Sequence, residues 1–382
     1  MTKMRFFLLF LSALLLLSTA EAQKKRKSTN KKVTKTVAST KSSTNKGRSI
    51  DYNLPVNELF KRACDAVDNE DSVLAVQYFT HLANVGHPQA MCAVGRALID
   101  NDSGKMSFTR EDNGASTKSI NSSLLRPNGI DIKRGRMYLE KVFDYGKQKD
   151  TTILWAIEQS ANKLGWSYYD TKEYSKAIFY FQESAEISND KYAMYGLGCI
   201  YNDLEDHTNA FKWEGKGAEL GHVVCMRMYG YDLVHGVGCT AGPQRGVMWL
   251  KKADELNDEI SSMLLSWYYY EEKEYAKAAY WAHQHIKKKK DSDGYFQLGL
   301  LYHFELGVDK DNKKAIEYLR EAMEFDKDNL DTMNLLAKCY SEEDNASYKD
   351  EAKKLVTKVL ESKNATDKQK DNARGILDSL NK

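Results

Sequence analysis

The sequence predicts an all-α protein, a solenoid built from about eight copies of one helix-turn-helix unit. A motif of small residues recurs along the chain, and a second motif with an aromatic residue follows most copies of it. All four prolines, which disfavour helix interiors, lie in expected turns or at helix starts. They are Pro55, Pro88, Pro127 and Pro243.

The first motif marks the first helix of each pair, and its clearest copy combines Ala193 with Leu197-Gly198. Each copy gives its helix a small face on which a second helix can pack closely. We expect the aromatic residue of the second helix to lie against the glycine, as at Gly198 and Gly165. The motif recurs as Ala90 with Val94-Gly95, Ser160 with Leu164-Gly165, Cys225 with Tyr229-Gly230, Ser261 with Leu265-Ser266, Gly294 with Leu298-Gly299 and Thr332 with Leu336-Ala337.

The second motif is a small residue followed three positions later by a large, mostly aromatic one. From Ala177 onward, successive small residues are 33, 36, 32, 37 and 37 positions apart, a spacing typical of helical solenoids. We expect Tyr180, Trp213, Trp249, Trp281 and Tyr318 to lie in the core. The eight copies are Ala75/Tyr78, Gly135/Tyr138, Ala177/Tyr180, Ala210/Trp213, Gly246/Trp249, Ala278/Trp281, Ala315/Tyr318 and Ala352/Leu355.

The turn between the two helices of a pair varies in length. Short turns occur at 202–208 and 271–274, and longer ones contain Gly236-Val237 or Gly307-Val308. With the two motifs and the Gly-Val turn, the sequence resembles the Sel-1-like repeat family, a relative of the tetratricopeptide repeat. The resemblance is to an exported, bacterial-type member of that family. The resemblance covers about residues 56–361 and implies a right-handed α-solenoid whose first helices line a concave face.

The N-terminus has the pattern of an export signal. Lys3 and Arg5 precede an apolar run over residues 6–17, and Ala20-Glu21-Ala22 supplies small residues for cleavage. The run is too short for a membrane-spanning helix, which needs about 20 apolar residues. We therefore expect residues 1–22 to be a signal peptide. The protein is then expected to be exported to the periplasm or cell envelope and to have no transmembrane segment after signal removal.

Residues 23–50 form a basic linker that we expect to be disordered. Ten Lys or Arg lie between Lys24 and Arg48, without an acidic residue. From Asp51 onward 44 basic residues (56 minus 12) face 53 acidic ones (54 minus 1), a net charge of −9. The linker has no aromatic residue on which bases could stack, so we expect no nucleic-acid partner. An anionic envelope surface is a possible partner for it.

The remaining boundaries divide the chain into a repeat solenoid over residues 51–362, an inserted loop at 101–129 and a capping helix within 363–382. The loop is rich in Ser, Asn, Thr and Gly and lacks a helical apolar period. We interpret it as a disordered insertion, with a functional loop as the alternative. In the last segment Ala373, Ile376, Leu377 and Leu380 recur at helical spacing, as expected of a cap.

The sequence shows no recognisable catalytic or metal-binding arrangement, so we predict no catalytic residues, no metal ligands and no cofactor. His283 and His285 are two positions apart and point to different faces of a helix, unlike a zinc-binding pair at four-residue spacing. The six cysteines have no regular spacing, unlike the cysteine pairs of cysteine-rich Sel-1-like proteins. We expect Cys92 and Cys225 to be buried free thiols.

The resemblance also implies a set of ligand contacts. In tetratricopeptide-like proteins these lie three positions before the packing glycine and one, four and five positions after it. Transferred to this chain, they predict a strongly aromatic groove. The partner-binding residues that we select from this set are Asn162, Trp166, Tyr169, Tyr195, Asn202, Arg227, Tyr231, Trp267, Tyr270, Phe296 and His303.

These features predict a non-enzymatic scaffold or adaptor that binds a protein or peptide in its concave face. Rigid aromatic side chains with a polar tip are frequent anchors of such interfaces. The alternative is a module that binds envelope glycan or peptidoglycan, because Trp and Tyr also stack on sugar rings. An enzyme is a third, less favoured hypothesis.

Overall fold

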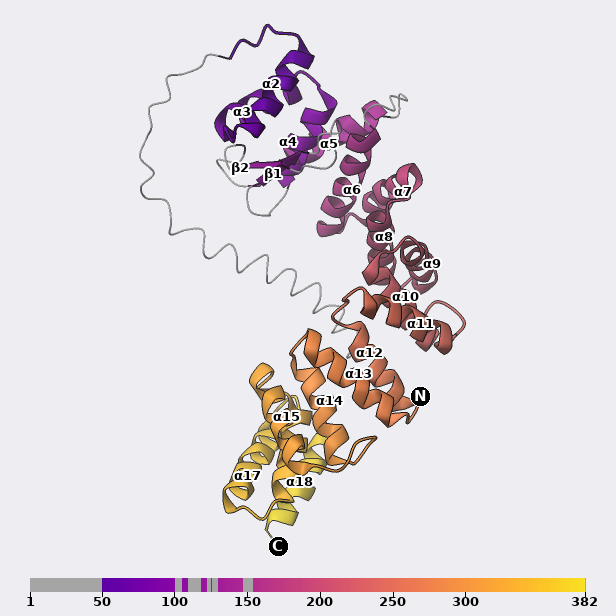
Figure 1. The fold of residues 1–382 in the computed structure, drawn as a ribbon, viewed down its shortest axis with the longest axis vertical. Helices are drawn as coiled ribbons and strands as arrows, with labels where there is room; N and C mark the ends of the chain where they lie inside the picture. The colour runs from indigo at the N-terminus through magenta and orange to yellow at the C-terminus, as the bar shows by residue number, and fades with distance from the viewer. Residues whose placement is uncertain are drawn as a thin grey trace, which may run out of the picture. The chain divides into compact units, whose positions relative to one another are not determined.

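The structure, a computed structural model, describes residues 50–99, 105–108, 118–121, 125, 130–146 and 154–381. The expected signal peptide and all of the basic linker except Ile50 lie outside the described residues. The described chain forms an α-solenoid of antiparallel helix pairs (Figure 1). It divides into two compact units, Met1–Ser188 and Asn189–Lys382, which we describe separately.

Unit 1 contains three helix pairs, each packed as an antiparallel hairpin. Its first core cluster joins all three pairs through fully buried side chains such as Leu82, Val142 and Ala161. The helices are α2 (Val56–Asp68), α3 (Ser72–Asn84), α4 (Pro88–Ile99), α5 (Ile132–Gly146), α6 (Leu154–Asp170) and α7 (Tyr174–Ser188), and the strands are β1 (Lys105–Phe108) and β2 (Lys118–Asn121).

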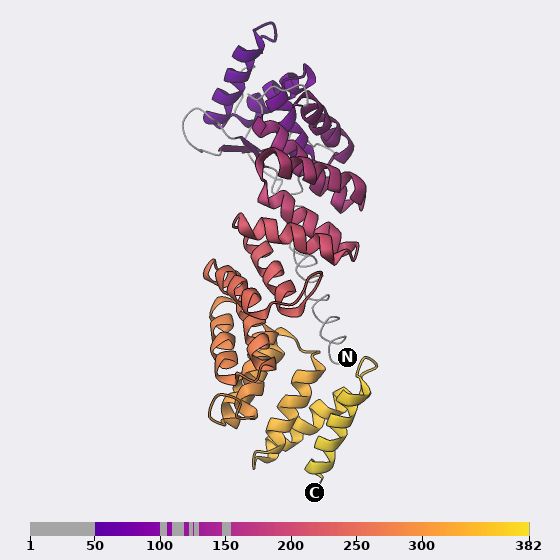
Figure 2. The same ribbon diagram turned by 90° about the vertical axis from the view of Figure 1, so that its right-hand side faces the viewer.

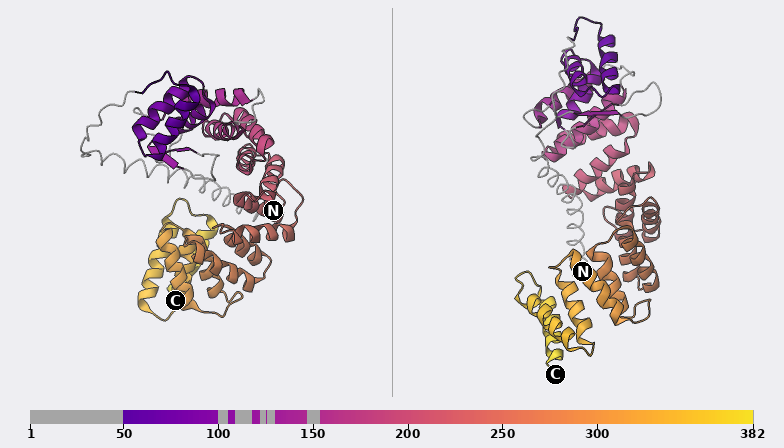
Figure 3. Two further views of the ribbon diagram at one scale, coloured as in Figure 1. Left: turned by 45° about the horizontal axis from the view of Figure 1, so that its top comes forward. Right: turned by 60° about the vertical axis from the view of Figure 1, so that its left-hand side comes forward.

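Unit 2 contains five helix pairs and one further helix, seen from other sides in Figures 2 and 3. The last helix, α18 (Asp367–Leu380), packs on α16 and α17 at the C-terminal end of the stack, where a cap is expected. The other helices are α8 (Lys191–Asp203), α9 (His207–Glu219), α10 (Val223–His235), α11 (Pro243–Glu255), α12 (Ser261–Glu271), α13 (Tyr275–Lys288), α14 (Ser292–His303), α15 (Asn312–Phe325), α16 (Leu330–Ser341) and α17 (Ala346–Glu361).

Polar residues define where most of these helices begin. Asp206 accepts a hydrogen bond from the Asn209 N–H, and Thr366 forms a complete capping box with Gln369. Such caps satisfy backbone donors that a helix leaves unpaired. Equivalent side-chain caps are formed by Asp71, Asp190, His222, Asp291, Asp311, Asn329 and Asn345.

The small residues of the first helices do bring the paired helices close together, but the packing partner differs from the expected aromatic residue. A Cβ atom at Gly165 would lie 2.6 Å from the Phe181 ring, and one at Gly299 would lie 2.6 Å from Leu319 Cγ. Both partners stand four positions after the small residue of the second helix. At Gly198 the residue at this position is Glu214, whose Cγ would lie 2.9 Å from an added Cβ.

The aromatic residues three positions after the small residue are correspondingly less buried than expected. Trp213 is 9% exposed and counts as core, whereas Tyr180, Trp249, Trp281 and Tyr318 are half-buried. Lysine ammonium groups cover two of the indoles, with Lys216 Nζ 4.2 Å from the Trp213 ring centre and Lys252 Nζ 4.4 Å from that of Trp249. These rings lie at the edge of the core because one side of each remains near solvent.

The longer Gly-Val turns hold neighbouring repeats together. Gly238 and Gly307 adopt positive φ angles of 66° and 69°, which glycine tolerates best. A Cβ atom at Gly238 would lie 2.1 Å from His207 O, and one at Gly307 would lie 2.2 Å from Ala276 N. Each long turn therefore packs its backbone directly on the start of the second helix of the preceding repeat.

The insertion at 101–129 differs from the expected disordered loop. The strands β1 and β2 pair antiparallel within it, with Met106 opposite Ile120. β1 lies beside α4, and β2 lies beside α2 and α3. In sequence, residues 105–108 alternate polar and apolar, the period of a strand, but four residues are too few to stand out in a search for helical periodicity.

Candidate binding surface

In two repeats, one in each unit, three aromatic rings lie one after another near the end of the first helix. The three residues have the same sequence spacing in both repeats. In unit 1, Trp166 contacts Tyr169 at a ring-centre distance of 5.6 Å, and Tyr169 contacts Tyr174 at 5.9 Å. We call these three residues the unit 1 ladder. All three are half-buried, so each presents part of its ring at the surface. The inner edge of the ladder is fixed by Phe181, which lies 5.1 Å from the Trp166 ring.

Unit 2 contains a second copy, the unit 2 ladder, formed by Trp267, Tyr270 and Tyr275. The two ring-centre distances are 5.8 Å and 5.6 Å, and both contacts are edge-to-face. The three residues are again half-buried. Edge-to-face packing is a favourable arrangement of aromatic rings, so these contacts stabilise the unit 2 ladder.

A shared turn explains why the third ring lies beside the second. In unit 2, Lys273 adopts a positive φ of 60°, and its N–H donates to Tyr270 O while the Glu274 N–H donates to Tyr269 O. This pattern ends α12 within four residues and begins α13 at Tyr275. Lys172 makes the same turn in unit 1 with a φ of 61°.

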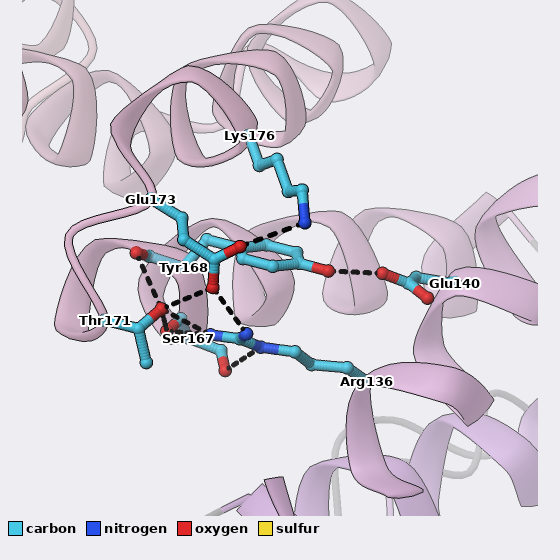
Figure 4. A network of polar contacts seen from close by, with 7 residues as sticks. All are labelled: Arg136, Glu140, Ser167, Tyr168, Thr171, Glu173 and Lys176. Carbon is cyan, nitrogen blue, oxygen red and sulfur yellow. Dashed lines mark hydrogen bonds and ion pairs between the residues drawn. The ribbon is translucent and has the colours of Figure 1, made fainter. Parts of the chain in front are cut away.

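In unit 1 an arginine from the preceding repeat holds this turn in place (Figure 4). Arg136 on α5 donates from Nη2 to Ser167 O at 2.6 Å and to Thr171 Oγ1 at 2.8 Å, and from Nη1 to Glu173 Oε1 at 2.9 Å. Its guanidinium carbon lies 3.8 Å from the centre of the Tyr168 ring. The arginine therefore binds both the end of α6 and the turn that positions Tyr174.

The charges around Arg136 complement one another. Hydrogen bonds from Lys176, Thr171 and Arg136 lower the pKa of Glu173 to about 2, so its carboxylate stays ionised in neutral solution. On the other side, the Tyr168 hydroxyl donates to Glu140 on α5 (Figure 4). Burial and this hydrogen bond raise the pKa of Tyr168. The network joins α5, α6 and α7 and supports the unit 1 ladder.

Two further predicted residues make aromatic contacts in unit 2. The Tyr195 ring stacks on His222 at 4.9 Å, between α8 and the start of α10. The Tyr231 ring lies 4.3 Å from His235 on the same helix. Both tyrosines are half-buried, and burial raises the pKa of Tyr231 to about 12. The His222 ring also contacts the Tyr192 ring, at a ring-centre distance of 5.2 Å.

The remaining predicted residues have structural contacts that were not anticipated. Arg227 is bound to Asp258, Asn202 donates to Glu214, and Phe296 packs against the core cluster of α16. His303 is 4% exposed, and its Nδ1 lies 3.3 Å from Cys339 Sγ. Asn162 is half-buried on α6. The structure thus gives these residues partners within the protein, and their part in binding stays a prediction.

Comparison with known proteins places the repeats in a family. The Sel1 repeat family matches residues 159–189, 191–222, 223–258 and 292–324. These four segments coincide with the helix pairs α6–α7, α8–α9, α10–α11 and α14–α15. The chain contains four Sel1 repeats. Proteins of this kind generally mediate protein–protein interaction.

A solved structure agrees with this fold. The chain is similar to c5321, a protective antigen of uropathogenic Escherichia coli strains with an SLR fold, at 17% identity and a TM-score of 0.59 over 86% of this chain and 72% of that one. It is also similar to a Sel1 repeat protein from Oxalobacter formigenes, at 21% identity and a TM-score of 0.43 over 58% and 98% of the two chains. No curated protein sequence matches this Sel1-repeat protein.

Sequence reasoning missed the third ring of each ladder in this Sel1-repeat protein. Tyr174 and Tyr275 begin second helices, whereas the transferred contact positions all lie on first helices or just after them. The signal was present, because the spacing Trp-x-x-Tyr-x-x-x-x-Tyr occurs in both repeats. This spacing is visible only when the two repeats are compared beyond the end of their first helices.

Within the described residues, no group of three or more His, Cys, Asp or Glu side chains is arranged to hold a metal ion. None of the described helices is both long and apolar enough to cross a membrane. Cys92 and Cys225 are fully buried free thiols, as expected from their positions in first helices.

Proposed function

We propose that this Sel1-repeat protein is a non-enzymatic scaffold or adaptor of the cell envelope, and that it binds protein or peptide partners through the two aromatic ladders. Export by residues 1–22 and attachment of the basic linker 23–50 to an anionic surface are parts of the same proposal. The observation that carries it is the repetition of one three-ring arrangement in two repeats.

The physical properties of the ladders support a role in binding. Trp and Tyr contribute large contact areas with few rotatable bonds, and truncation of such an anchor often weakens binding by about 2 kcal/mol or more. Each ladder is already ordered by its own ring contacts and by a tight turn, so little conformational entropy is lost when a partner binds. Tyr and Trp side chains also carry a hydroxyl or an indole N–H that can hydrogen-bond to a partner.

The proposal predicts that Trp267→Ala weakens partner capture at least tenfold while the fold is retained, because the substitution removes the first ring of the unit 2 ladder. Capture from an envelope extract by immobilised protein, quantified at several bait concentrations, measures this effect. The matched control is Tyr280→Ala on α13 of the same repeat, where the ring is 56% exposed. Circular dichroism of both variants monitors folding.

Several outcomes separate this function from its alternatives. Equal capture by the parent and by Trp267→Ala would show that the unit 2 ladder is not the binding surface. Retention on purified peptidoglycan, lost in Trp267→Ala, would favour the glycan-binding alternative over a protein adaptor. Unfolding of Trp267→Ala to the extent expected for the core variant Trp213→Ala would identify Trp267 as a packing residue.

A further inference from the structure

One buried core position of the solenoid carries a carboxyl group. The residue four positions after the small residue of each second helix packs against the first helix of the same pair. Glu214 on α9 occupies this position and is 0% exposed. In the other seven repeats the equivalent residues, all buried and apolar, are Phe79, Leu139, Phe181, Leu250, Ala282, Leu319 and Val356.

A second carboxyl group from the next repeat meets Glu214. Asp232 on α10 stands two positions after the packing glycine Gly230 and is 7% exposed. At this position four other repeats have Ala97, Ile200, Leu301 and Cys339, which are all buried. Helices α9 and α10 pack against each other, and the carboxyl groups of Asp232 and Glu214 are close enough to interact. The pair therefore joins α9 of the fourth repeat to α10 of the fifth.

Only part of the hydrogen-bonding capacity of Glu214 is satisfied by other side chains. Asn202 Nδ2 on α8 donates to Glu214 Oε1 at 2.7 Å. Glu214 Oε2 is buried, and no N–H or O–H group of the described residues donates to it. A proton on either carboxyl group would supply a donor for a hydrogen bond between the two side chains. Without that proton, two negative charges would share one buried site.

The groups around the pair provide little compensation for two charges. Cys199 faces Glu214 from α8, Cys225 faces it from α10, and the Cys239 thiol donates to Asp232 O. The nearby basic group is His207 at the start of α9, which is itself exposed. The guanidinium of Arg227 on α10 is bound to Asp258.

We propose that Glu214 and Asp232 share a proton and form a pH-sensitive joint, which holds the fourth and fifth repeats together at neutral pH and loosens as the pH rises. The proposal is independent of the partner of the ladders. Loosening would act on α9 and α10, between the Tyr195–His222 contact and the Tyr231–His235 contact.

The direction of the effect follows from the proton balance. Burial and the neighbouring Glu214 carboxylate raise the pKa of Asp232 to about 10, and burial also raises the pKa of Glu214. In the unfolded chain both groups have an ordinary carboxyl pKa near 4. The folded state thus binds more protons, so the stabilisation is fully present below about pH 4 and is lost as the pH rises towards 10.

The test is amide hydrogen exchange of the full chain at pH 6, 7 and 8, read in peptides from α9 and α10. Asp232→Asn replaces the protonated carboxyl by a neutral group of the same shape. Because parent and variant are compared at the same pH, the chemical exchange rate cancels. We expect the opening constant of the parent to rise relative to that of Asp232→Asn by about tenfold per pH unit, the slope for one proton.

Matched variants make the result decisive. Glu219→Gln removes an exposed carboxylate from the same helix, and its exchange should follow that of the parent at every pH. Glu214→Gln should behave like Asp232→Asn, and it serves if Asp232→Asn does not fold. A ratio that stays constant with pH overturns the proposal. Unfolding of both variants at pH 6 overturns it as well, because the carboxylates would then be required in their charged form.

Discussion

Replacing Arg227 by alanine should lower the free energy of unfolding by about 3–5 kcal/mol, because it leaves a buried carboxylate without its cation. Arg227 Nη1 lies 3.0 Å from Asp258 Oδ1, and the two side chains are only 12% and 6% exposed. Asp258 Oδ2 in turn accepts from the backbone N–H of Ser261 at 2.9 Å and from its hydroxyl at 2.8 Å. The pair therefore fixes α10 to the start of α12, and urea denaturation measures its loss.

The control for this prediction is an arginine whose ion pair is exposed. Arg374 on α18 lies 2.7 Å from Asp371, but the side chains are 62% and 68% exposed. Arg374→Ala should change the free energy of unfolding by no more than about 1 kcal/mol. If Arg227→Ala is as mild as Arg374→Ala, Arg227 is not held by Asp258 and is again a candidate for contact with an acidic partner.

Adding one methyl group at Gly246 should destabilise the fifth repeat by about 1–3 kcal/mol. A Cβ atom there would lie 2.5 Å from Gly230 O and 2.7 Å from a methyl group of Val234. The clash with backbone cannot be relieved by a change of rotamer, so α10 and α11 must separate. Thermal unfolding of Gly246→Ala, followed by circular dichroism, measures the loss.

The same substitution at Gly375 should change the stability in the opposite direction. This glycine lies within α18, and an added Cβ would meet nothing within 4 Å. Gly375→Ala should therefore stabilise the helix by about 0.5–1 kcal/mol, the usual difference in helix propensity. Equal shifts in the two variants would show that the helices of the fifth repeat are not in close contact at Gly230 and Gly246.

The helix pairs could be predicted from sequence because each repeat carries its own local signals. A glycine or other small residue on the first helix, a small residue on the second and a capping residue such as Asp206 all act within one pair. Helical periodicity is visible in single segments of this length. The two strands in the insertion were missed, because four alternating residues resemble an ordinary polar loop.

The site was harder to predict because its contacts join residues that are distant in sequence. Arg227 was expected to face a partner, yet its ion pair is with Asp258, which lies 31 residues away, just before the next repeat. Asn202 was expected in the groove, but it donates to Glu214 on the second helix. Transfer by position in the repeat identifies which helix carries a residue, whereas the side-chain partner depends on how other segments pack against that helix.

The central claim is that partners bind at the aromatic ladders, and site-specific photo-crosslinking tests it most directly. A photoreactive phenylalanine derivative in place of Tyr270 in the unit 2 ladder should crosslink a defined envelope protein. The same group in place of Tyr280, on the second helix of the same repeat, should not crosslink that protein. Crosslinking of the same protein with equal yield from both positions, or from Tyr280 alone, would contradict the account.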